Sequence, residues 1–588
     1  MVDERQVALT KALMTHFEAI GVSRRQFFKL LAKYGGGASV AALIAACGGA
    51  EEGTETPAAP ATQATPTSAA ASPAAGASPA AGATPQPTGQ VTPKVLVFGS
   101  GQDISNLDPH VGHDYSIASN QRSVYDTLVR YQGNPPEIEN LLATEYESNE
   151  DASEWTFKLD PRAVFHDGTP VKASDVVYSV GRLIRKNKGP AWMFVNIMGE
   201  DSAEAIDDHT VKFTLNTPFA PLPLILPWLF IVNEKVVREH DVNGDEGEAW
   251  LLDHEAGSGP FIIKRWQPGD SYEFEALPDY WWGWPKEGRL AGYIWKIIRE
   301  SSSQRLALLN GDVHIVAGLE LNAEDVQALL NEPGFHVNNE PGLSVFAVKL
   351  NNQRGPTSDV NVRKAISYAM DYEAVIQALN GRAVLLEGPL PPPLKEYVSP
   401  NVKPYRHDMD KAREYLAKSQ YPNGGFELEY VYVVGLDIEE QIGLILLDKL
   451  SQLNINVRMQ SMVWPDMVAR AKTVETAPDM MAVYSGTSYA DPDNFLWQAY
   501  HSSQAGFWAA ASHYKNPQLD KLLEAARAAP SHDERVRLYH QATEILVNDA
   551  VEVWVHSQLS NVVWSDKVGG YRYCPIMGYY LQPLWLKD

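Results

Sequence analysis

The sequence predicts an α/β protein that follows a long N-terminal segment of a different character. Three observations support this prediction. The chain has 588 residues, 45% of them apolar, which is enough to build large cores. Strand-like and helix-like patterns alternate after about residue 320. All 15 tryptophans lie at or after Trp155, so the packed part of the chain begins well after the N-terminus.

The first folded segments show alternating strands before any long helix. Residues 154–159 alternate apolar and polar side chains, as a half-buried strand does. A helix is expected to open at Ser174 and Asp175, with Val176, Val180 and Leu183 on its inner face. The other expected features are strands at 95–98, 211–215, 261–263 and 272–274, and turns at 166–170 and 268–270.

The second part of the chain predicts a sheet covered by helices. Residues 362–370 and 442–453 each place apolar side chains on one stripe with the helical period. Alternating strands and helices of this kind favour a parallel or mixed sheet. Strands are expected at 343–350, 427–433, 454–460 and 480–484, and helices at 359–380, 408–419, 437–453, 516–529 and 532–549.

Charge and cysteine content exclude several classes of protein. The chain carries 49 Lys and Arg against 73 Asp and Glu, a formal charge of −24. Nucleic-acid binding needs a dense basic footprint, so no nucleic-acid partner is expected. Two cysteines, Cys47 and Cys574, exclude a disulfide scaffold and a thiolate metal cluster. No run of 18 apolar residues occurs that could form a mature membrane-spanning helix.

The N-terminal segment has the pattern of an export signal. Residues 1–46 carry six basic and three acidic residues, and a short apolar stretch at 38–46 suits a signal core. Residues 23–29, with Arg24 and Arg25, resemble a twin-arginine signal. Residues 44–48 resemble a bacterial lipoprotein signal, in which Cys47 becomes the lipidated N-terminus. The alternative is an ordinary amphipathic helix with a chance cysteine.

Residues 48–93 predict a disordered linker. They contain eight prolines and no aromatic, leucine, isoleucine or basic residue. Such a segment cannot bury enough apolar surface to offset the entropy of ordering. We therefore expect a tether between a lipid anchor at Cys47 and the folded body, with Cys574 as a buried small apolar residue.

Motifs for catalysis are incomplete. Ile104 occupies the place of the third glycine that a dinucleotide loop starting at Gly99 would need. The chain has neither a P-loop nor a nucleophile elbow. The acidic loops at 241–245 and 491–494 lack the glycine and the bidentate glutamate of a calcium loop. We predict no catalytic residue, no metal site and no cofactor, and a protein that is not an enzyme.

Long motifs in the body resemble family 5 extracellular solute-binding proteins, the peptide/nickel-type receptors of ABC importers. The resemblance covers about 490 residues, essentially the whole body. Its motifs occur in order at 107–110, 124–128, 155–171, 173–179, 257–261, 279–282, 362–371 and 491–495.

The resemblance implies a two-lobed fold of the periplasmic-binding-protein type, in its large three-subdomain form with mixed sheets and a hinge. Lobe I is expected at 94–318, with an inserted subdomain near 116–252, and again at 553–588. Lobe II is expected at 319–552. Such a monomer is expected to capture an oligopeptide or a similar small solute by hinge closure and to deliver it to the membrane subunits of an ABC permease. It is extracytoplasmic and held to the cell membrane by its lipid anchor.

The resemblance also places ligand-binding candidates on both lobes. Most signature residues, including Asp167, Arg363 and Asp371, are expected to be structural. The candidates are Tyr115, Trp192 and Trp228 from lobe I, and Tyr484, Ser485, Gly486, Thr487, Ser488, Tyr489 and Asp491 from lobe II.

Position 488 departs from the family pattern. Peptide-binding members carry there an Asp that pairs with the ligand's α-ammonium group, and this chain has Ser488. A hydroxyl does not replace a buried charge pair. Asp491 could serve instead, or the ligand could be a sugar, an opine or a metal chelate in place of a peptide. A secreted hydrolase and a purely structural surface lipoprotein remain the alternatives from other classes.

Overall fold

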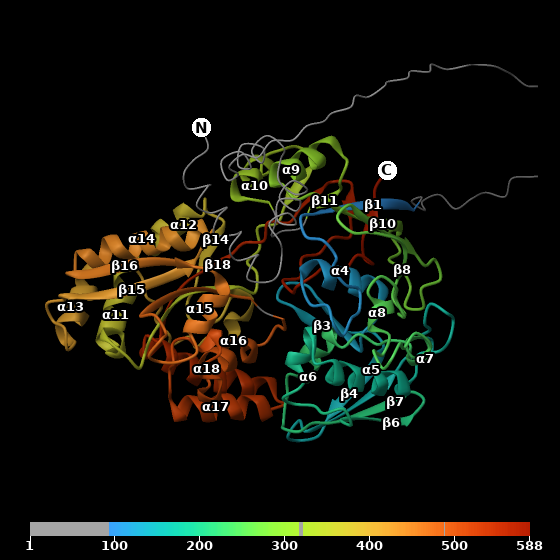
Figure 1. Cartoon of the computed structure of the whole chain (residues 1–588), viewed down its shortest axis with the longest axis horizontal. Coiled ribbons are helices and arrows are strands. Elements are labelled where there is room, and N and C mark those ends of the chain that lie inside the picture. The colour runs from blue at the N-terminus through green and yellow to red at the C-terminus, as the bar shows by residue number, and fades with distance from the viewer. Residues whose placement is uncertain (1–92, 317–320, 487) are drawn as a thin grey trace, which may run out of the picture. The chain divides into compact units, whose positions relative to one another are not determined.

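The computed structural model describes residues 93–316, 321–486 and 488–588. These residues form two large sheets and several smaller ones, with helices packed around them (Figure 1). The expectations for Cys47, Arg24, Arg25 and Thr487 lie outside the described residues. Within the described part of the chain, every helix is too short or too polar to cross a bilayer.

The first large sheet has seven strands in the order β12-β19-β11-β1-β10-β9-β8. β1 (Lys94–Ser100) lies between β10 and β11 and is parallel to both. Its Phe98 stacks on Trp295 of β10 with ring centroids 4.3 Å apart, so the sheet has an aromatic core. The other strands are β8 (Phe261–Gln267), β9 (Ser271–Ala276), β10 (Leu290–Ile297), β11 (Ile315–Val316), β12 (Phe335–Val337) and β19 (Val563–Ser565).

A four-stranded antiparallel sheet is inserted between β1 and β8, inside the range expected for a subdomain. In its strand β5 (Glu154–Leu159), Trp155, Phe157 and Leu159 face inward, which confirms the alternating pattern. The helix α5 (Ala173–Lys186) packs against this sheet. The remaining elements of this region are β2 (Val129–Gln132), β3 (Glu137–Asn140), β4 (Ala143–Ser148), β6 (Ala203–Asp207), β7 (Thr210–Thr214), α4 (Tyr115–Val124), α6 (Leu222–Ile225), α7 (Glu234–Glu239) and α8 (Glu248–Leu251).

The second large sheet has six strands in the order β14-β18-β13-β17-β15-β16 and is mixed, as predicted. Its strand β13 (Val345–Leu350) is buried along its whole length, as a central strand covered on both faces must be. Lys349 of β13 pairs with Glu552 of β18 at 2.8 Å, so the one buried amine on this strand has a carboxylate partner. The other strands are β14 (Ala383–Leu385), β15 (Phe426–Val433), β16 (Ile455–Met462), β17 (Met480–Ser485) and β18 (Glu552–Gln558).

The helices predicted for this second region occur close to their expected ranges except at one place, and the helices at Trp464–Arg470 and Pro492–Tyr500 were not predicted. A single helix was expected at 359–380, but the chain forms two, α11 and α12. Met370 leaves the helical conformation, and the Asp371 carboxylate accepts from the Ala374 amide and starts α12. The helices of this region are α11 (Val360–Ala369), α12 (Tyr372–Ala378), α13 (Met409–Lys418), α14 (Asp437–Ser451), α15 (Trp464–Arg470), α16 (Pro492–Tyr500), α17 (Pro517–Ala528) and α18 (His532–Asn548). Two further helices, α9 (Ser301–Asn310) and α10 (Ala323–Leu329), pack beside β11 and β12 of the seven-stranded sheet.

The chain passes twice between the two large sheets. β12 hydrogen-bonds to β19 in the seven-stranded sheet, whereas β18 belongs to the six-stranded sheet. Sheet membership therefore changes within 338–344 and within 559–562. The expected boundaries at 318/319 and 552/553 lie ahead of these points. The difference arises because strand pairing is long-range, and a local pattern does not specify the partner.

The two crossing segments, 338–344 and 559–562, run side by side. The Ser560 amide donates to the Glu340 carbonyl at 3.0 Å, and Pro341 forms an antiparallel bridge with Leu559. The crossing segments thus form a short two-stranded ribbon between the sheets.

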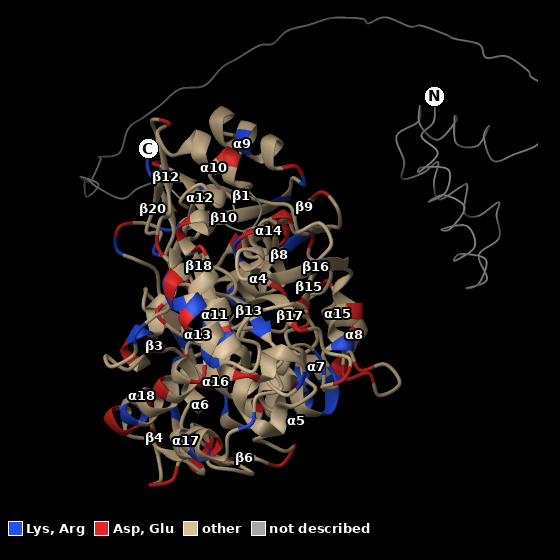
Figure 2. Cartoon of the chain, turned by 90° about the vertical axis from the view of Figure 1, so that its left-hand side faces the viewer, with Lys and Arg blue, Asp and Glu red and all other residues tan. Residues whose placement is uncertain are grey.

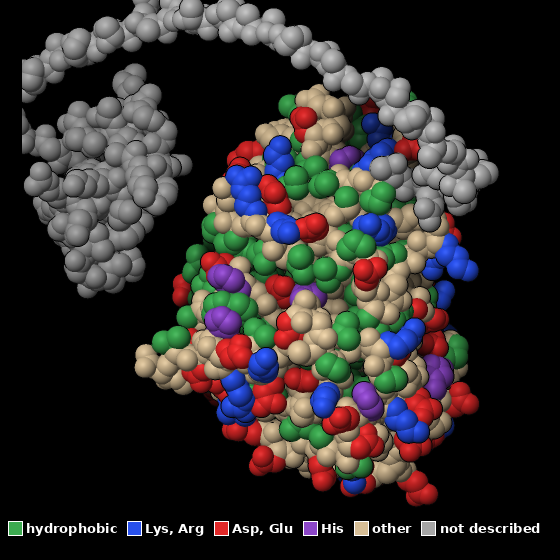
Figure 3. Space-filling view, turned by 90° about the vertical axis from the view of Figure 1, so that its right-hand side faces the viewer, with side chains coloured by type: hydrophobic (Ala, Val, Ile, Leu, Met, Phe, Trp, Pro, Cys, Tyr) green, Lys and Arg blue, Asp and Glu red, His purple; other side chains and the backbone are tan. Residues whose placement is uncertain are grey.

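Charged side chains of both signs are spread over the surface. Acidic and basic residues alternate over the helices in Figure 2, and they mix with apolar residues on the face in Figure 3. Both views agree with an acidic chain that lacks a basic stripe on these faces.

Candidate functional site

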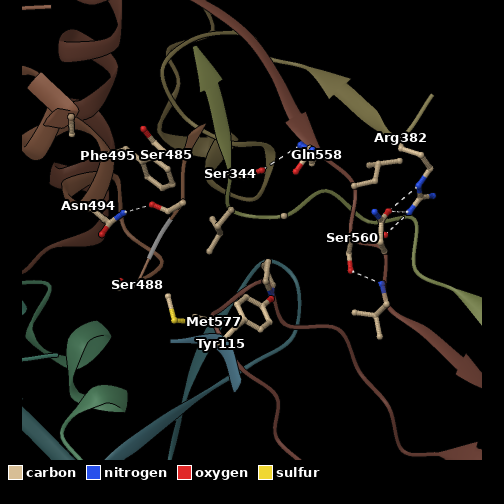
Figure 4. A pocket seen from close by; sticks show the side chains of 18 of the residues that line it. Tyr115, Ser344, Arg382, Ser485, Ser488, Asn494, Phe495, Gln558, Ser560 and Met577 are labelled. Atoms are coloured by element: carbon tan, nitrogen blue, oxygen red, sulfur yellow. Dashed lines mark hydrogen bonds between the residues drawn. The ribbon is translucent and has the colours of Figure 1, made fainter. Parts of the chain in front are cut away.

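A cavity of about 860 Å³ lies beside the crossing segments. Its lining comes from both sides of those segments, for example Tyr115 of α4 and Ser485 at the end of β17. This volume falls in the range of small-molecule sites. Figure 4 shows the lining side chains around the open space, with Phe495 and Ser485 at one end and Arg382 at the other.

One wall of the cavity is aromatic and apolar. Tyr115, Tyr573 and Met577 line it from the region of the seven-stranded sheet. Burial raises the pKa of the Tyr115 hydroxyl to about 12, so this group stays protonated and can donate a hydrogen bond at neutral pH. Trp192 also lines the cavity, and 42% of its surface remains exposed, so its indole is available to a ligand.

The loop after β17 forms the opposite wall. Ser485, Gly486 and Ser488 all line the cavity, as the sequence predicted for this segment. The Asn494 amide of α16 donates to the Gly486 carbonyl at 3.4 Å. Trp228 is fully buried behind the wall, and its indole N–H donates to the Ser488 carbonyl at 2.5 Å. Trp228 therefore positions Ser488 and does not line the cavity.

Two further candidates, Tyr484 and Tyr489, do not line the cavity. The Tyr484 hydroxyl lies 3.3 Å from the His556 ring nitrogen, beneath the sheet surface. The Tyr489 hydroxyl donates to the Asp493 carboxylate at 2.8 Å inside the core. These contacts make both tyrosines structural.

Asp491 cannot take the role that was considered for it. Its carboxylate is 1% exposed and pairs with the Arg535 guanidinium at 2.5 Å. It also accepts from the Asp493 amide at the start of α16. Both functions are those of a helix cap with a buried ion pair, so Asp491 is not free to meet a ligand's ammonium group.

Arg382 lines the cavity beside the crossing segments, and sequence reasoning missed it. Its guanidinium donates to the Asn338 carbonyl at 2.9 Å and to the Ser560 carbonyl. It also donates to the side-chain oxygens of Asn339 and Asn561. Arg382 therefore holds both crossing segments at once, and all of these acceptors are neutral.

Other lining residues lie in the crossing segments or directly beside them. Ser344, Gln558 and Ser560 face the cavity. The backbone N–H of Gln558 donates to the Ser344 hydroxyl at 3.3 Å (Figure 4). The feature that could have identified these cavity residues is the topology of the chain. A chain that changes sheets twice must bring those two segments together, and a cleft forms between the parts that they join.

The cavity lining is almost uncharged. Among its described residues, Arg382 carries the sole charge, and neither a carboxylate nor a histidine is present. The remaining polar groups are hydroxyls and amides such as Ser488, Asn494 and Gln498. The described lining thus offers neither the paired carboxylates nor the Ser–His pair that the hydrolase alternative requires.

The motifs behind the family resemblance meet at one buried carboxylate away from the cavity. Asp126 accepts from the Tyr280 hydroxyl at 2.8 Å, the Trp281 indole at 2.8 Å and the Ser258 hydroxyl at 3.0 Å. Burial raises the Asp126 pKa to about 6, although these hydrogen bonds oppose the shift. Nearby, a Cβ atom on Gly257 would lie 1.8 Å from the Val124 carbonyl oxygen. The signature residues thus fix the fold, as expected.

Comparisons with known proteins agree with the family resemblance of the sequence. Residues 137–507 match the sequence model of the bacterial extracellular solute-binding proteins, family 5. A probable D,D-dipeptide-binding periplasmic protein of Escherichia coli is 32% identical over 491 residues, covering 82% of this chain and 92% of that protein.

Two solved structures share the fold. The ABC transporter-associated periplasmic binding protein DppA of Helicobacter pylori, in complex with a peptide, is 28% identical with a TM-score of 0.67, covering 84% of this chain and 98% of that one. HbpA2 of Haemophilus parasuis is 24% identical with a TM-score of 0.77, covering 84% of this chain and 100% of that one.

Proposed function

The chain belongs to the bacterial extracellular solute-binding proteins of family 5, and from that premise we propose that it is the solute receptor of an ABC importer for short peptides or peptide-like solutes. The observation that carries the proposal is the cavity of about 860 Å³, lined from both sides of the crossing segments. Two relatives are a probable D,D-dipeptide-binding protein and a dipeptide-binding protein, and a similar structure is that of an ABC transporter-associated protein in complex with a peptide.

The proposed mechanism is binding by hinge closure about the ribbon at 338–344 and 559–562. Lobe I would be the seven-stranded sheet with its inserted sheet, and lobe II the six-stranded sheet. A ligand that touches both lobes stabilises the closed state through its differential affinity. A shift from mostly open to mostly closed needs about a 10⁴-fold preference, or roughly 5.5 kcal/mol. The closed receptor would then present its ligand to the permease.

The test combines native mass spectrometry of the purified protein with thermal unfolding in the presence of a di- and tripeptide mixture. A bound peptide at 100-fold excess over Kd adds about 2.7 kcal/mol to the free energy of unfolding. If neither a retained solute nor a shift in Tm is found, the receptor function is contradicted.

A matched pair of glycine variants sharpens this test. A Cβ atom at Gly486 meets nothing within 4 Å, so Gly486→Leu fills the cavity without a clash in the wall. A Cβ atom at Gly199 also meets nothing within 4 Å, but Gly199 lies outside the cavity. We expect Gly486→Leu to abolish the ligand-induced shift and Gly199→Leu to keep it. Equal behaviour of the two variants would contradict the assignment of this cavity.

We further propose that Cys47 is lipidated and holds the receptor at the cell membrane. The support is the lipoprotein-like pattern at 44–48 and the proline-rich segment that follows it. Cys47→Ser should move the protein from the membrane fraction to the soluble extracytoplasmic fraction. Cys574→Ser is the control, because Cys574 is half-buried in the folded body and its burial raises the thiol pKa to about 12.

A further inference from the structure

Two buried arginines border the cavity without a carboxylate partner. Arg382 and Arg122 are each 6% exposed. Neither forms an ion pair within the described part of the chain. Burying a guanidinium away from water is costly unless an anion compensates it. A pair of uncompensated cations at one cavity is therefore a feature that calls for an explanation.

Arg382 has hydrogen-bonding capacity to spare. A guanidinium has five N–H groups. The Nε hydrogen and both groups on Nη2 are accounted for by Asn561, Asn338 and Ser560. Nη1 has a single acceptor, the Asn339 side chain, and it carries two hydrogens. One N–H on Nη1 of Arg382 thus has no acceptor among the described residues.

Among the described residues, no carboxylate lies near enough to Arg382 to oppose the effect of burial on its pKa. Its pKa is lowered, and burial is the sole cause. Buried Arg363 is a useful contrast, since it too binds only carbonyl oxygens, at the end of α18. Asp549 and Asp359 oppose the lowering of the Arg363 pKa, so that charge has compensation which Arg382 lacks.

Arg122 adds a second positive charge one layer behind the wall. Its Nη1 donates to the carbonyl of Met577, a lining residue, at 2.6 Å. Its guanidinium lies over the Trp228 ring, 4.5 Å from the centroid. Its Nε and Nη2 have no hydrogen-bond partner among the described residues. The field of this charge reaches the cavity through a weakly polarisable wall.

No group in the described lining offsets these charges. The position where an acidic side chain would receive an ammonium group is Ser488, and Asp491 is consumed by Arg535. A ligand ammonium would therefore lose its hydration without gaining a charged partner. A ligand carboxylate would gain a charge-assisted hydrogen bond from Arg382 in a site where such bonds are strong.

From this charge pattern we propose that the cavity selects solutes that carry a free carboxylate and lack a free α-ammonium group, with the carboxylate at Arg382. N-acylated or otherwise N-blocked peptides are the chemical class. The inference rests on the proposed receptor function and narrows its substrate.

The test uses one mixture of synthetic di- and tripeptides in three forms: unmodified, N-acetylated, and N-acetylated with a C-terminal amide. Native mass spectrometry of the full chain selects the best-bound sequence, and calorimetry then measures Kd for its three forms. We expect the N-acetylated acid to bind more tightly than the unmodified peptide. We expect the amide to bind at least about tenfold more weakly, which corresponds to roughly 1.4 kcal/mol.

Variants connect the preference to Arg382. In Arg382→Gln, the affinities for the N-acetylated acid and its amide should come within about twofold of each other, and Arg382→Lys should restore part of the difference. Arg413→Gln is the control, because Arg413 forms an exposed pair with Asp410 on α13. The ratio of two affinities is insensitive to general damage at the hinge, since both probes meet the same protein.

The outcomes separate the two proposals. If the unmodified peptide binds as tightly as its N-acetylated form or more tightly, or the amide binds as tightly as the acid, this inference fails and the receptor function stands. If no form binds, the peptide-receptor function fails and this inference fails with it.

Discussion

The arginines near the start of α16 and those near the cavity differ in their partners. At the start of α16, Arg535 pairs with Asp491 and Arg527 pairs with Asp493, both at hydrogen-bonding distance. At the cavity, Arg382 and Arg122 meet only neutral oxygens and aromatic rings. The first group fixes packing between helices. The second group leaves a positive field at the cavity that we propose binds the solute, which is the difference expected between a structural site and a binding site.

The largest expected effect is on the structural group. Asp491→Asn leaves the Arg535 charge buried without its anion, and we expect a loss of about 3–5 kcal/mol in the free energy of unfolding. Urea unfolding followed by circular dichroism measures this loss. Glu534→Gln is the control, because it breaks an exposed pair with Arg537 and should cost less than about 1 kcal/mol. If Asp491→Asn and Glu534→Gln lost equal free energies of unfolding, the buried pair would not be a special structural contact.

The next effect would reverse the charge preference of the cavity. Ser488→Asp places a carboxylate in the wall where the described lining has none. The ratio of affinities for the unmodified and N-acetylated peptides should shift by about tenfold toward the unmodified form, or roughly 1.4 kcal/mol. Calorimetry measures it. Ser105→Asp, at an exposed loop position, should leave the ratio unchanged. An unchanged ratio in Ser488→Asp would show that position 488 does not face the ligand.

Buried carboxylates divide in the same way as the arginines. Glu429 pairs with Arg470, and that hydrogen bond lowers its pKa. Glu439 is 1% exposed without an arginine, and burial raises its pKa to about 7, opposed by a hydrogen bond from the Val433 amide. The folded state therefore holds a proton on Glu439 that the unfolded state releases near its ordinary pKa. Stability from this group is full below about pH 4.5 and is lost as the pH rises toward about 7.

Glu439→Gln should remove this pH dependence. The amide keeps an oxygen for the Val433 N–H and carries no charge at any pH. Relative to the wild-type protein, we expect the variant to gain about 1–3 kcal/mol in going from pH 5 to pH 8. Urea unfolding at the two pH values measures the change. Glu429→Gln should not show this gain, since its carboxylate is stabilised by Arg470. A constant difference between Glu439→Gln and wild type at both pH values would be contrary to the assignment.

The smallest effect concerns the charge that does not touch the cavity. Arg122→Met keeps an apolar stem against Trp228 and removes the charge behind the wall. We expect the preference for the N-acetylated acid over its amide to fall by about threefold, less than for Arg382→Gln, because Arg122 acts through its field alone. The same calorimetric pair measures it. If Arg122→Met lost more of this preference than Arg382→Gln does, Arg122 and not Arg382 would be the main carboxylate partner.

The sequence predicted local elements better than it predicted the cavity. The strands at 427–433 and 480–484 and the helix at 532–549 were found within a few residues, because their periodicity is a local property. Ser485, Gly486 and Ser488, which the family resemblance named as candidates, do line the cavity, although their role in binding stays a prediction. These are the parts of the site that a continuous segment defines.

The other parts depend on contacts between distant segments. Arg382 becomes a cavity residue because its loop meets two crossing segments, at 338–339 and 560–561, that are far from it in sequence. Trp228 was expected in the wall and lies behind it, since its indole finds a carbonyl on Ser488. Asp491 was considered as a ligand partner, but Arg535 lies 44 residues away, and its pairing is visible only in the folded chain.

The paired crossing segments decide what kind of movement the halves can make. Two hydrogen-bonded strands flex easily across their thin direction and resist sliding along their length. The two lobes should thus rotate about a single hinge axis and should not slide past each other. Arg382 hydrogen-bonds to both strands at this axis. A ligand that binds its guanidinium would therefore act directly on the hinge.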